Sequence, residues 1–262
     1  MRRLWCALAL GLLLGIAGSA RADEQADLKA VIDKAIKAHG GEANLTKHKA
    51  ATWKGKGTYH GQGQAIPFSA EWFSQPPGQH TVRVEAEANG MKFMFIEVVN
   101  GDKGWSKAGE ELKEMDKETL AEKKEQIYGN WVASLAPLKD KEFKFTSLGE
   151  VEIGKRAAVG VNVARKDHRD VKLFFDKKTG RLLKREMRIK DTEANQEATE
   201  EAFYHDYKLM DGVWRACKHG TGSTASGKSG AGSRESVRLG RLRRSLRFFG
   251  RRTPDPLLQT PF

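Results

Sequence analysis

Cysteine is nearly absent from this chain, whose 262 residues include two, Cys6 and Cys217. Cys6 lies in an N-terminal segment that we expect to be removed, so one thiol is left and no internal disulfide can form. The chain must therefore fold on its hydrophobic core, and the roughly 190 residues of its central part are enough for a single domain.

Long apolar runs are also missing, apart from one short run near the N-terminus. Two arginines precede the apolar stretch 4–17, and residues 20–22 read Ala-Arg-Ala, a small-x-small cleavage site. The stretch is too short to cross a bilayer as a helix, and the arrangement is typical of a secretory signal peptide. We therefore predict a signal peptide over residues 1–22, cleavage before Asp23, and a soluble, exported mature chain.

The body of the chain lacks an excess of either charge, although the whole sequence has a formal net charge of +12. Residues 23–215 hold 33 Lys or Arg against 32 Asp or Glu, whereas residues 216–262 hold ten basic and two acidic residues. Nucleic-acid binders need a basic stripe on their folded body. We therefore expect no nucleic-acid partner.

No catalytic constellation stands in a suitable context. The string GSTASGKS, Gly222–Ser229, matches the P-loop pattern, but no buried strand precedes it and glycines follow where a helix should begin. The triplet His168-Arg169-Asp170 imitates a kinase catalytic loop, yet a strand pattern follows it directly. The histidines show no metal-ligand spacing, and Cys217 has no evident base partner. We reject the nucleotide site and predict no cofactor, no metal and no enzymatic activity.

The composition changes at residue 216. Residues 216–262 are rich in Arg, Gly and Ser, and they show no strand alternation. Three interpretations stay open: a disordered basic tail, a membrane-surface segment at residues 237–249, or the product of a frameshift in the gene. The frameshift is favoured, because a further strand is expected after DGVWR, and alternating sequence in another frame downstream of codon 215 would support it. We therefore end the predicted domain at residue 215.

Two segments of the body have helical periodicity. Residues 27–39 place apolar side chains at i, i+3, i+4, i+7 and i+8, and two glycines follow as a stop signal. Residues 116–135 form a second apolar stripe, with Asp116 as the N-cap and Pro137 as the terminator. We predict an N-terminal and an internal helix.

The rest of the body alternates as strands do. Strand patterns follow one another without intervening helices, which argues against a parallel α/β sheet. The segment 91–99 is apolar at both odd and even positions, which predicts a strand in mid-sheet that is covered on both faces. The sum is an α+β, mainly β fold, in which a long antiparallel meander curls around its two helices.

Large aromatic residues gather in the predicted strands and are the candidates for a binding site. Two interpretations compete: ordinary core packing, or the lining of an apolar cavity for acyl chains, since small-ligand sites are concave and mostly apolar. Burial of each CH₂ group is favourable by about 0.8 kcal/mol, so such a site needs no charged anchor. The candidates are Trp53, Tyr59, Phe68, Trp72, Phe93, Phe95 and Phe174.

Four segments carry a resemblance to a known family: GGEANL at 40–45, NGDKGW at 100–105, FDKKTGRLLK at 175–184 and FYHDYKLMDGV at 203–213. Together with the signal peptide, they resemble the outer-membrane lipoprotein carrier (LolA/LolB-like) superfamily, and more narrowly the LolA-like proteins of planctomycete-type bacteria. The resemblance covers residues 24–215. It implies an unclosed, curved antiparallel sheet (a half-barrel) whose concave face is covered by helices around an apolar cavity.

The resemblance further implies a periplasmic, non-enzymatic and monomeric carrier that shields lipid or lipoprotein acyl chains. The alternative is an envelope sensor or interaction domain that uses the same curved sheet to bind a protein partner. Co-purified lipid would favour the carrier, whereas a stoichiometric protein partner would favour the sensor.

Overall fold

The computed structural model describes residues 16–61, 64–88, 90–191, 195–225 and 235–240. Its helices are α1 (Ile16–Ala38), α2 (Glu42–Thr46) and α3 (Lys117–Ala133). In this described part of the chain, no helix is long and apolar enough to span a membrane. The expected signal peptide lies partly outside the described residues, and the expected cleavage point before Asp23 falls within α1.

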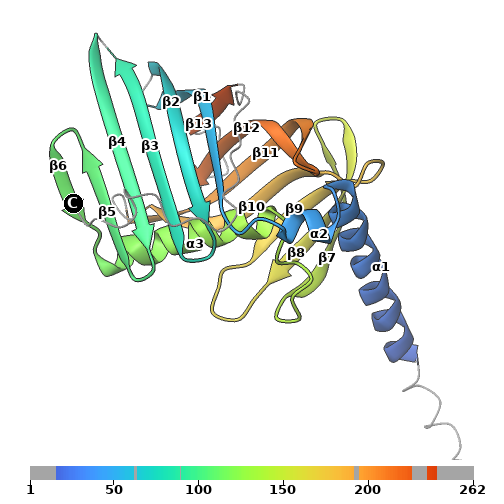
Figure 1. The fold of residues 1–262 in the computed structure, drawn as a ribbon. Helices are drawn as coiled ribbons and strands as arrows, with labels where there is room; N and C mark the ends of the chain where they lie inside the picture. Colours follow the sequence, from blue (N-terminus) through green and yellow to red (C-terminus); the bar gives the residue numbers. More distant parts are fainter. Residues whose placement is uncertain (1–15, 62–63, 89, 192–194, 226–234, 241–262) are drawn as a thin grey trace, which may run out of the picture.

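All strands of the described residues belong to one antiparallel, 13-stranded sheet (Figure 1). Its order is β6-β5-β4-β3-β2-β1-β13-β12-β11-β10-β9-β8-β7, so β6 and β7 are free edges and the sheet is unclosed. The predicted antiparallel, mainly β fold is therefore confirmed. The strands are β1 (Ala51–Gly61), β2 (Gln64–Gln75), β3 (Gln79–Ala88), β4 (Met91–Asn100), β5 (Lys103–Ala108), β6 (Glu111–Glu114), β7 (Lys144–Ile153), β8 (Arg156–Ala164), β9 (Val171–Asp176), β10 (Leu182–Asp191), β11 (Gln196–Met210), β12 (Val213–Ala225) and β13 (Glu235–Gly240).

The sheet consists of two meanders, β1–β6 and β7–β12, which we call the first and the second half. They are joined by β13, which pairs with β1 on one side and with β12 on the other. Figure 1 shows the two halves curving around α3. The helix contacts β4 in the first half and β9 and β10 in the second.

The strand pattern does not stop at residue 215, where the sequence predicted the end of the domain. Strand β12 continues through Ala225, paired with β11 up to Ala198. The backbone pairing fixes this strand, although its Gly, Ser and Thr residues give no apolar alternation. Gly222, the first residue of the P-loop match, lies inside this antiparallel strand opposite Glu201. The segments 226–234 and 241–262 lie outside the described residues, so the three interpretations of the tail stay open there.

The hydrophobic core belongs to the second half. Apolar residues of α1 that the periodicity predicted to face inward are buried, among them Leu28, Ile32 and Ile36. They pack with residues of α3 and with the strands β8–β10, and the cluster includes no described residue of β1–β6. The strand side of the cluster consists of Val161, Val163, Val171, Leu173, Phe175 and Leu182, together with Val213 at the start of β12.

Helix α3 begins as predicted, since the Asp116 side chain accepts a hydrogen bond of 2.8 Å from the Thr119 N–H. Its C-terminal half is buried at Ile127, Tyr128 and Val132. Gly129 allows a close approach to the sheet, because a Cβ there would lie 2.4 Å from the Met187 sulfur. The helix is thereby seated on the inner side of β10.

Candidate functional site

Residue pairing across β1–β4 defines two faces of the first half, because directly paired residues of antiparallel strands point to the same side. One face, which we call the inner face, carries the odd positions 51–59 of β1, the even positions 66–74 of β2, the even positions 80–88 of β3 and the odd positions 91–99 of β4. Lys123 of α3 reaches Glu97 on this face, with 3.0 Å between Nζ and Oε2. The inner face therefore faces the helix.

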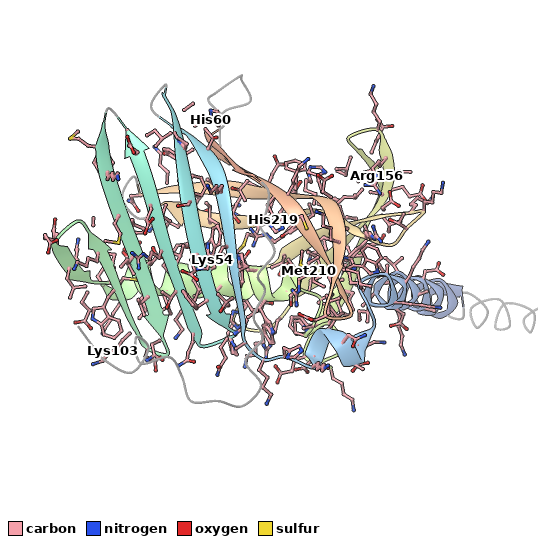
Figure 2. All side chains as sticks on the ribbon, turned by 45° about the horizontal axis from the view of Figure 1, so that its top comes forward. Lys54, His60, Lys103, Arg156, Met210 and His219 are labelled. Atoms are coloured by element: carbon pink, nitrogen blue, oxygen red, sulfur yellow. The ribbon has the colours of Figure 1, made fainter. Side chains whose placement is uncertain are left out.

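Charge is sharply divided between the two faces. Among the described residues of β1–β4, Glu97 is the one charged side chain on the inner face. The opposite, outer face carries one charged residue after another, including the Lys54–Glu71 pair at 2.7 Å between β1 and β2. Figure 2 shows the side chains on β1, with Lys54 and His60 of the outer face labelled. The charged outer-face positions are Lys54, Lys56, Glu71, Arg83, Glu85, Glu87 and Lys92.

Six of the seven aromatic candidates lie on the inner face: Trp53, Tyr59, Phe68, Trp72, Phe93 and Phe95. The rings of Trp53 and Trp72, which pair directly, are stacked at 6.1 Å between centroids. The register of β1–β4 brings these residues together on one face.

The seventh candidate, Phe174, does not join them. It pairs with Gly160 and Lys184 on the side of β9 that faces away from the core residues Leu173 and Phe175. Its ring is 6% exposed, and the Lys184 ammonium lies 4.8 Å from the ring centroid. The alternation of VKLFFD indicates this separation, because Phe174 shares its face with Lys172 and Asp176, opposite Val171, Leu173 and Phe175.

The segment 91–95 of β4 is not covered on both faces, which corrects the expectation for this strand. On the inner face Met91 is 59% exposed, Phe93 50% and Phe95 38%, whereas Met94 of the outer face is 39% exposed. Further along the strand, Glu97 and Val99 are buried near α3. Helix α3 therefore covers one end of the inner face and leaves the other end open.

We call the apolar part of the inner face, from Trp53 and Trp72 to Met91, the open apolar face. Sequence reasoning missed Met91, although it continues the alternation of Phe93 and Phe95. Ile66, Val82, Val84 and Ala86 fill the face between the aromatic residues and are half-buried. The face is defined by Trp53, Tyr59, Ile66, Phe68, Trp72, Val82, Val84, Ala86, Met91, Phe93 and Phe95.

A small polar group borders the open apolar face where it meets α3. Its members are Glu97, Lys123 and His80, and sequence reasoning identified none of them as functional. His80 lies on the inner face one pair along from Val82 and Glu97. Burial, followed by the nearby Lys123 charge, lowers the pKa of His80 to about 4, so its imidazole is neutral at pH 7. Its Nδ1 is buried and has no hydrogen-bond partner among the described residues.

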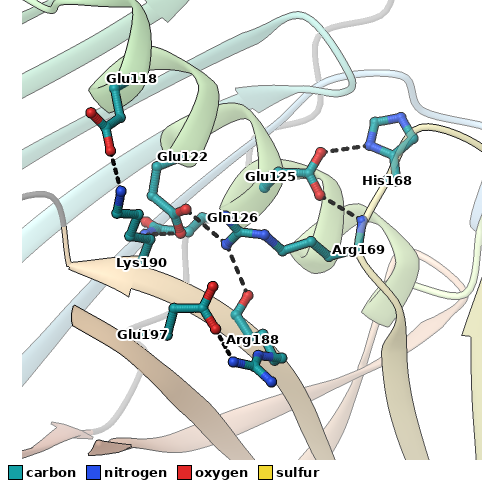
Figure 3. Close-up of polar contacts among 9 residues, drawn as sticks. All are labelled: Glu118, Glu122, Glu125, Gln126, His168, Arg169, Arg188, Lys190 and Glu197. Atoms are coloured by element: carbon teal, nitrogen blue, oxygen red, sulfur yellow. Dashed lines mark hydrogen bonds and ion pairs between the residues drawn. The ribbon is translucent and has the colours of Figure 1, made fainter. Parts of the chain in front are cut away.

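Ion pairs fix the N-terminal half of α3 over the sheet (Figure 3). Glu122 pairs with Arg169 at 2.7 Å, and Glu118 pairs with Lys190 of β10. Glu125 accepts hydrogen bonds of 2.8 Å from both the His168 ring and the Arg169 N–H. On the other side, Lys123 and Lys124 pair with Glu97 and with Asp102. Both halves of the sheet are therefore attached to the same helix.

The His168-Arg169-Asp170 triplet serves this attachment. It forms part of the connection between β8 and β9, as the sequence predicted for a hairpin turn. The His168 ring stacks on Tyr128 of α3 at 3.9 Å between centroids. Among the described residues, no group of three or more His, Cys, Asp or Glu side chains is placed to hold a metal ion.

Neither a protein-family model nor a curated protein matches the sequence. Among solved structures, a LolA superfamily protein from Nitrosomonas europaea aligns with a TM-score of 0.50 at 10% identity, over 88% of this chain and 96% of that one. A DUF1329 family protein from Desulfovibrio piger aligns with a TM-score of 0.46 at 13% identity, over 84% and 92% of the two chains. The first likeness supports the superfamily resemblance at the level of the fold, and the planctomycete-type relation stays a prediction.

Proposed function

We propose that this chain is an exported, non-enzymatic protein that binds lipid or lipoprotein acyl chains on the open apolar face. The observation that carries the proposal is the charge division of β1–β4. One face excludes charge almost completely and collects aromatic side chains, yet Met91, Phe93 and Phe95 stay in contact with solvent. Exposed apolar area of this kind is typical of a binding surface.

The two halves of the sheet have different roles in the fold, and this difference supports the same function. The second half buries its inner face against α1 and α3 and supplies the core. The first half adds no described residue to that core, so its apolar face is not needed to close the fold. Each CH₂ group buried on that face would contribute about 0.8 kcal/mol, which suits a flexible hydrocarbon chain.

The periplasmic location belongs to the same proposal. A signal peptide over residues 1–22 would export the chain to the periplasm, where acyl chains in transit need shielding from water. The relation of the fold to the LolA superfamily protein is consistent with a carrier, although the likeness concerns the fold alone.

Two substitutions on one strand test the proposal. Phe93→Gln places a polar group on the open apolar face, whereas Met94→Gln does so one residue later on the outer face. Both residues are exposed, so neither change opens a cavity in the core. Native mass spectrometry after gentle purification should find bound lipid on the unaltered protein and on Met94→Gln, and at least severalfold less on Phe93→Gln.

Equal lipid occupancy in the two variants would contradict the proposed site. An empty face with a stoichiometric protein partner in the unaltered sample would instead favour the sensor or interaction domain.

A further inference from the structure

The ion pair Glu97–Lys123 borders the open apolar face. Glu97 is 8% exposed and follows Phe95 on the same side of β4. It pairs with Val82, which in turn pairs with Trp72, so the carboxylate lies directly beside the aromatic part of the face.

Lys123 is already matched by Glu97. Its ammonium lies 3.0 Å from the carboxylate, while the neighbouring Lys124 pairs at 2.8 Å with Asp102, whose side chain is 97% exposed. A ligand anion that approached Lys123 would therefore meet the Glu97 carboxylate as well. Like charges at short distance repel strongly when they are partly buried.

An uncharged hydrogen-bond acceptor on the ligand would not be repelled by Glu97. A lysine ammonium has three N–H donors, and the contact with Glu97 uses one direction. An ester carbonyl could accept from another donor of Lys123 without displacing Glu97. His80, neutral and with a buried, unpartnered Nδ1, adds no positive charge that would offset the carboxylate.

We propose that Glu97 and Lys123 make the open apolar face selective for acyl esters over free fatty acids. This inference rests on the proposed function, since it specifies the ligand of that site. Glu97 repels ligands with an ionised carboxylate. Lys123 donates a hydrogen bond to the ester carbonyl of a ligand whose acyl chain is esterified to an uncharged group.

The test compares 11-bromoundecanoate with its methyl ester at pH 8, where the acid is ionised. Bromine quenches tryptophan at short range, and Trp53 and Trp72 report from the face itself. The ester is more apolar than the ionised acid, so it should bind the unaltered protein more tightly whether or not Glu97 and Lys123 select for it. The test is therefore how the ratio of the two dissociation constants changes in two variants.

Glu97→Gln leaves Lys123 free to pair with the ligand carboxylate, so the preference for the ester should fall by about tenfold, equivalent to about 1.4 kcal/mol. Lys123→Gln keeps an amide N–H donor for the ester carbonyl but leaves Glu97 without its counter-ion, so the preference for the ester should rise. A purely structural role for the pair would weaken both ligands alike in both variants, with an unchanged ratio.

An unchanged ratio, or a shift in the same direction in both variants, overturns the inference while the proposed function stands. Should Glu97→Gln fail to fold, the sign of the Lys123→Gln shift decides by itself. A triglyceride and a triacylated lipopeptide, titrated as competitors, represent the two sources of acyl esters. If neither of them binds, ester selectivity is overturned. Absence of quenching by both bromo ligands in the unaltered protein contradicts the proposed function as well.

Discussion

At the scale of single residues, Gly40 shows how tightly the N-terminal helix is joined to the sheet. Its φ is 118°, and a Cβ there would lie 2.1 Å from the Gly212 carbonyl oxygen. Beside it, the His39 carbonyl accepts a hydrogen bond of 2.9 Å from the Trp214 N–H. Two segments that carry the family resemblance, GGEANL and FYHDYKLMDGV, therefore meet in space at this junction.

Gly40→Ala should lower the free energy of unfolding by at least about 2 kcal/mol, because the backbone conformation and the contact both exclude a side chain. Gly101→Ala is the matched control: its φ is 61°, but a Cβ there meets nothing within 4 Å, so only the conformational cost of about 1 kcal/mol applies. Urea unfolding measures both. Equal losses would show that the junction is looser than the contact indicates.

At the scale of secondary-structure elements, the contact between α3 and the first half includes a buried histidine, His80 of β3, close to Lys123 of α3. His80 has a lowered pKa of about 4 because burial, and then Lys123, disfavour its charged form. The unfolded chain takes up this proton near pH 6.5, so the folded state loses stability as the pH falls from about 6.5 toward 4. Above pH 6.5 the contribution is complete.

His80→Gln should therefore reduce the difference in unfolding free energy between pH 7.5 and pH 5. The expected reduction is at most about 2 kcal/mol, because the proton uptake of the unfolded chain between about pH 6.5 and pH 5 is what contributes. His60→Gln, an exposed change on the outer face, should leave the difference as it was. Denaturant titrations at the two pH values give the comparison, and identical behaviour of the two variants would exclude His80 as the cause.

The elements also show where sequence reasoning succeeds and where it fails. Alternation put Trp53 and Tyr59 on one face of their strand and Phe68 and Trp72 on one face of the next, since a half-buried strand shows its faces in its period. The contact between Trp53 and Trp72 follows from the register of the two strands, which the sequence did not predict. The apolar run of β4 was misinterpreted as a covered strand, because a strand with exposed apolar side chains on both faces produces the same run. For Phe174, alternation with Lys172 and Asp176 separates it from Val171, Leu173 and Phe175, a signal that its choice as a cavity candidate overlooked.

At the scale of the whole molecule, one half of the sheet supplies the core and the other supplies the open apolar face. The sequence predicted the antiparallel meander and its two main helices from local patterns. It could not predict that α3 would cover only the Glu97 end of the first half, because that depends on ion pairs between residues far apart in the chain, such as Glu122–Arg169. The course of β12 beyond residue 215 likewise rests on pairing with β11.

The central claim, that acyl chains bind to the inner rather than the outer face of the first half, is tested most directly on two methionines of β4. Met91 lies on the inner face and Met94 on the outer, and both are exposed. In a protein with ¹³C-labelled methionine methyl groups, addition of an acyl ester that carries a nitroxide should broaden the Met91 NMR signal clearly more than that of Met94. Equal broadening of both signals, or broadening of Met94 alone, would contradict the claim.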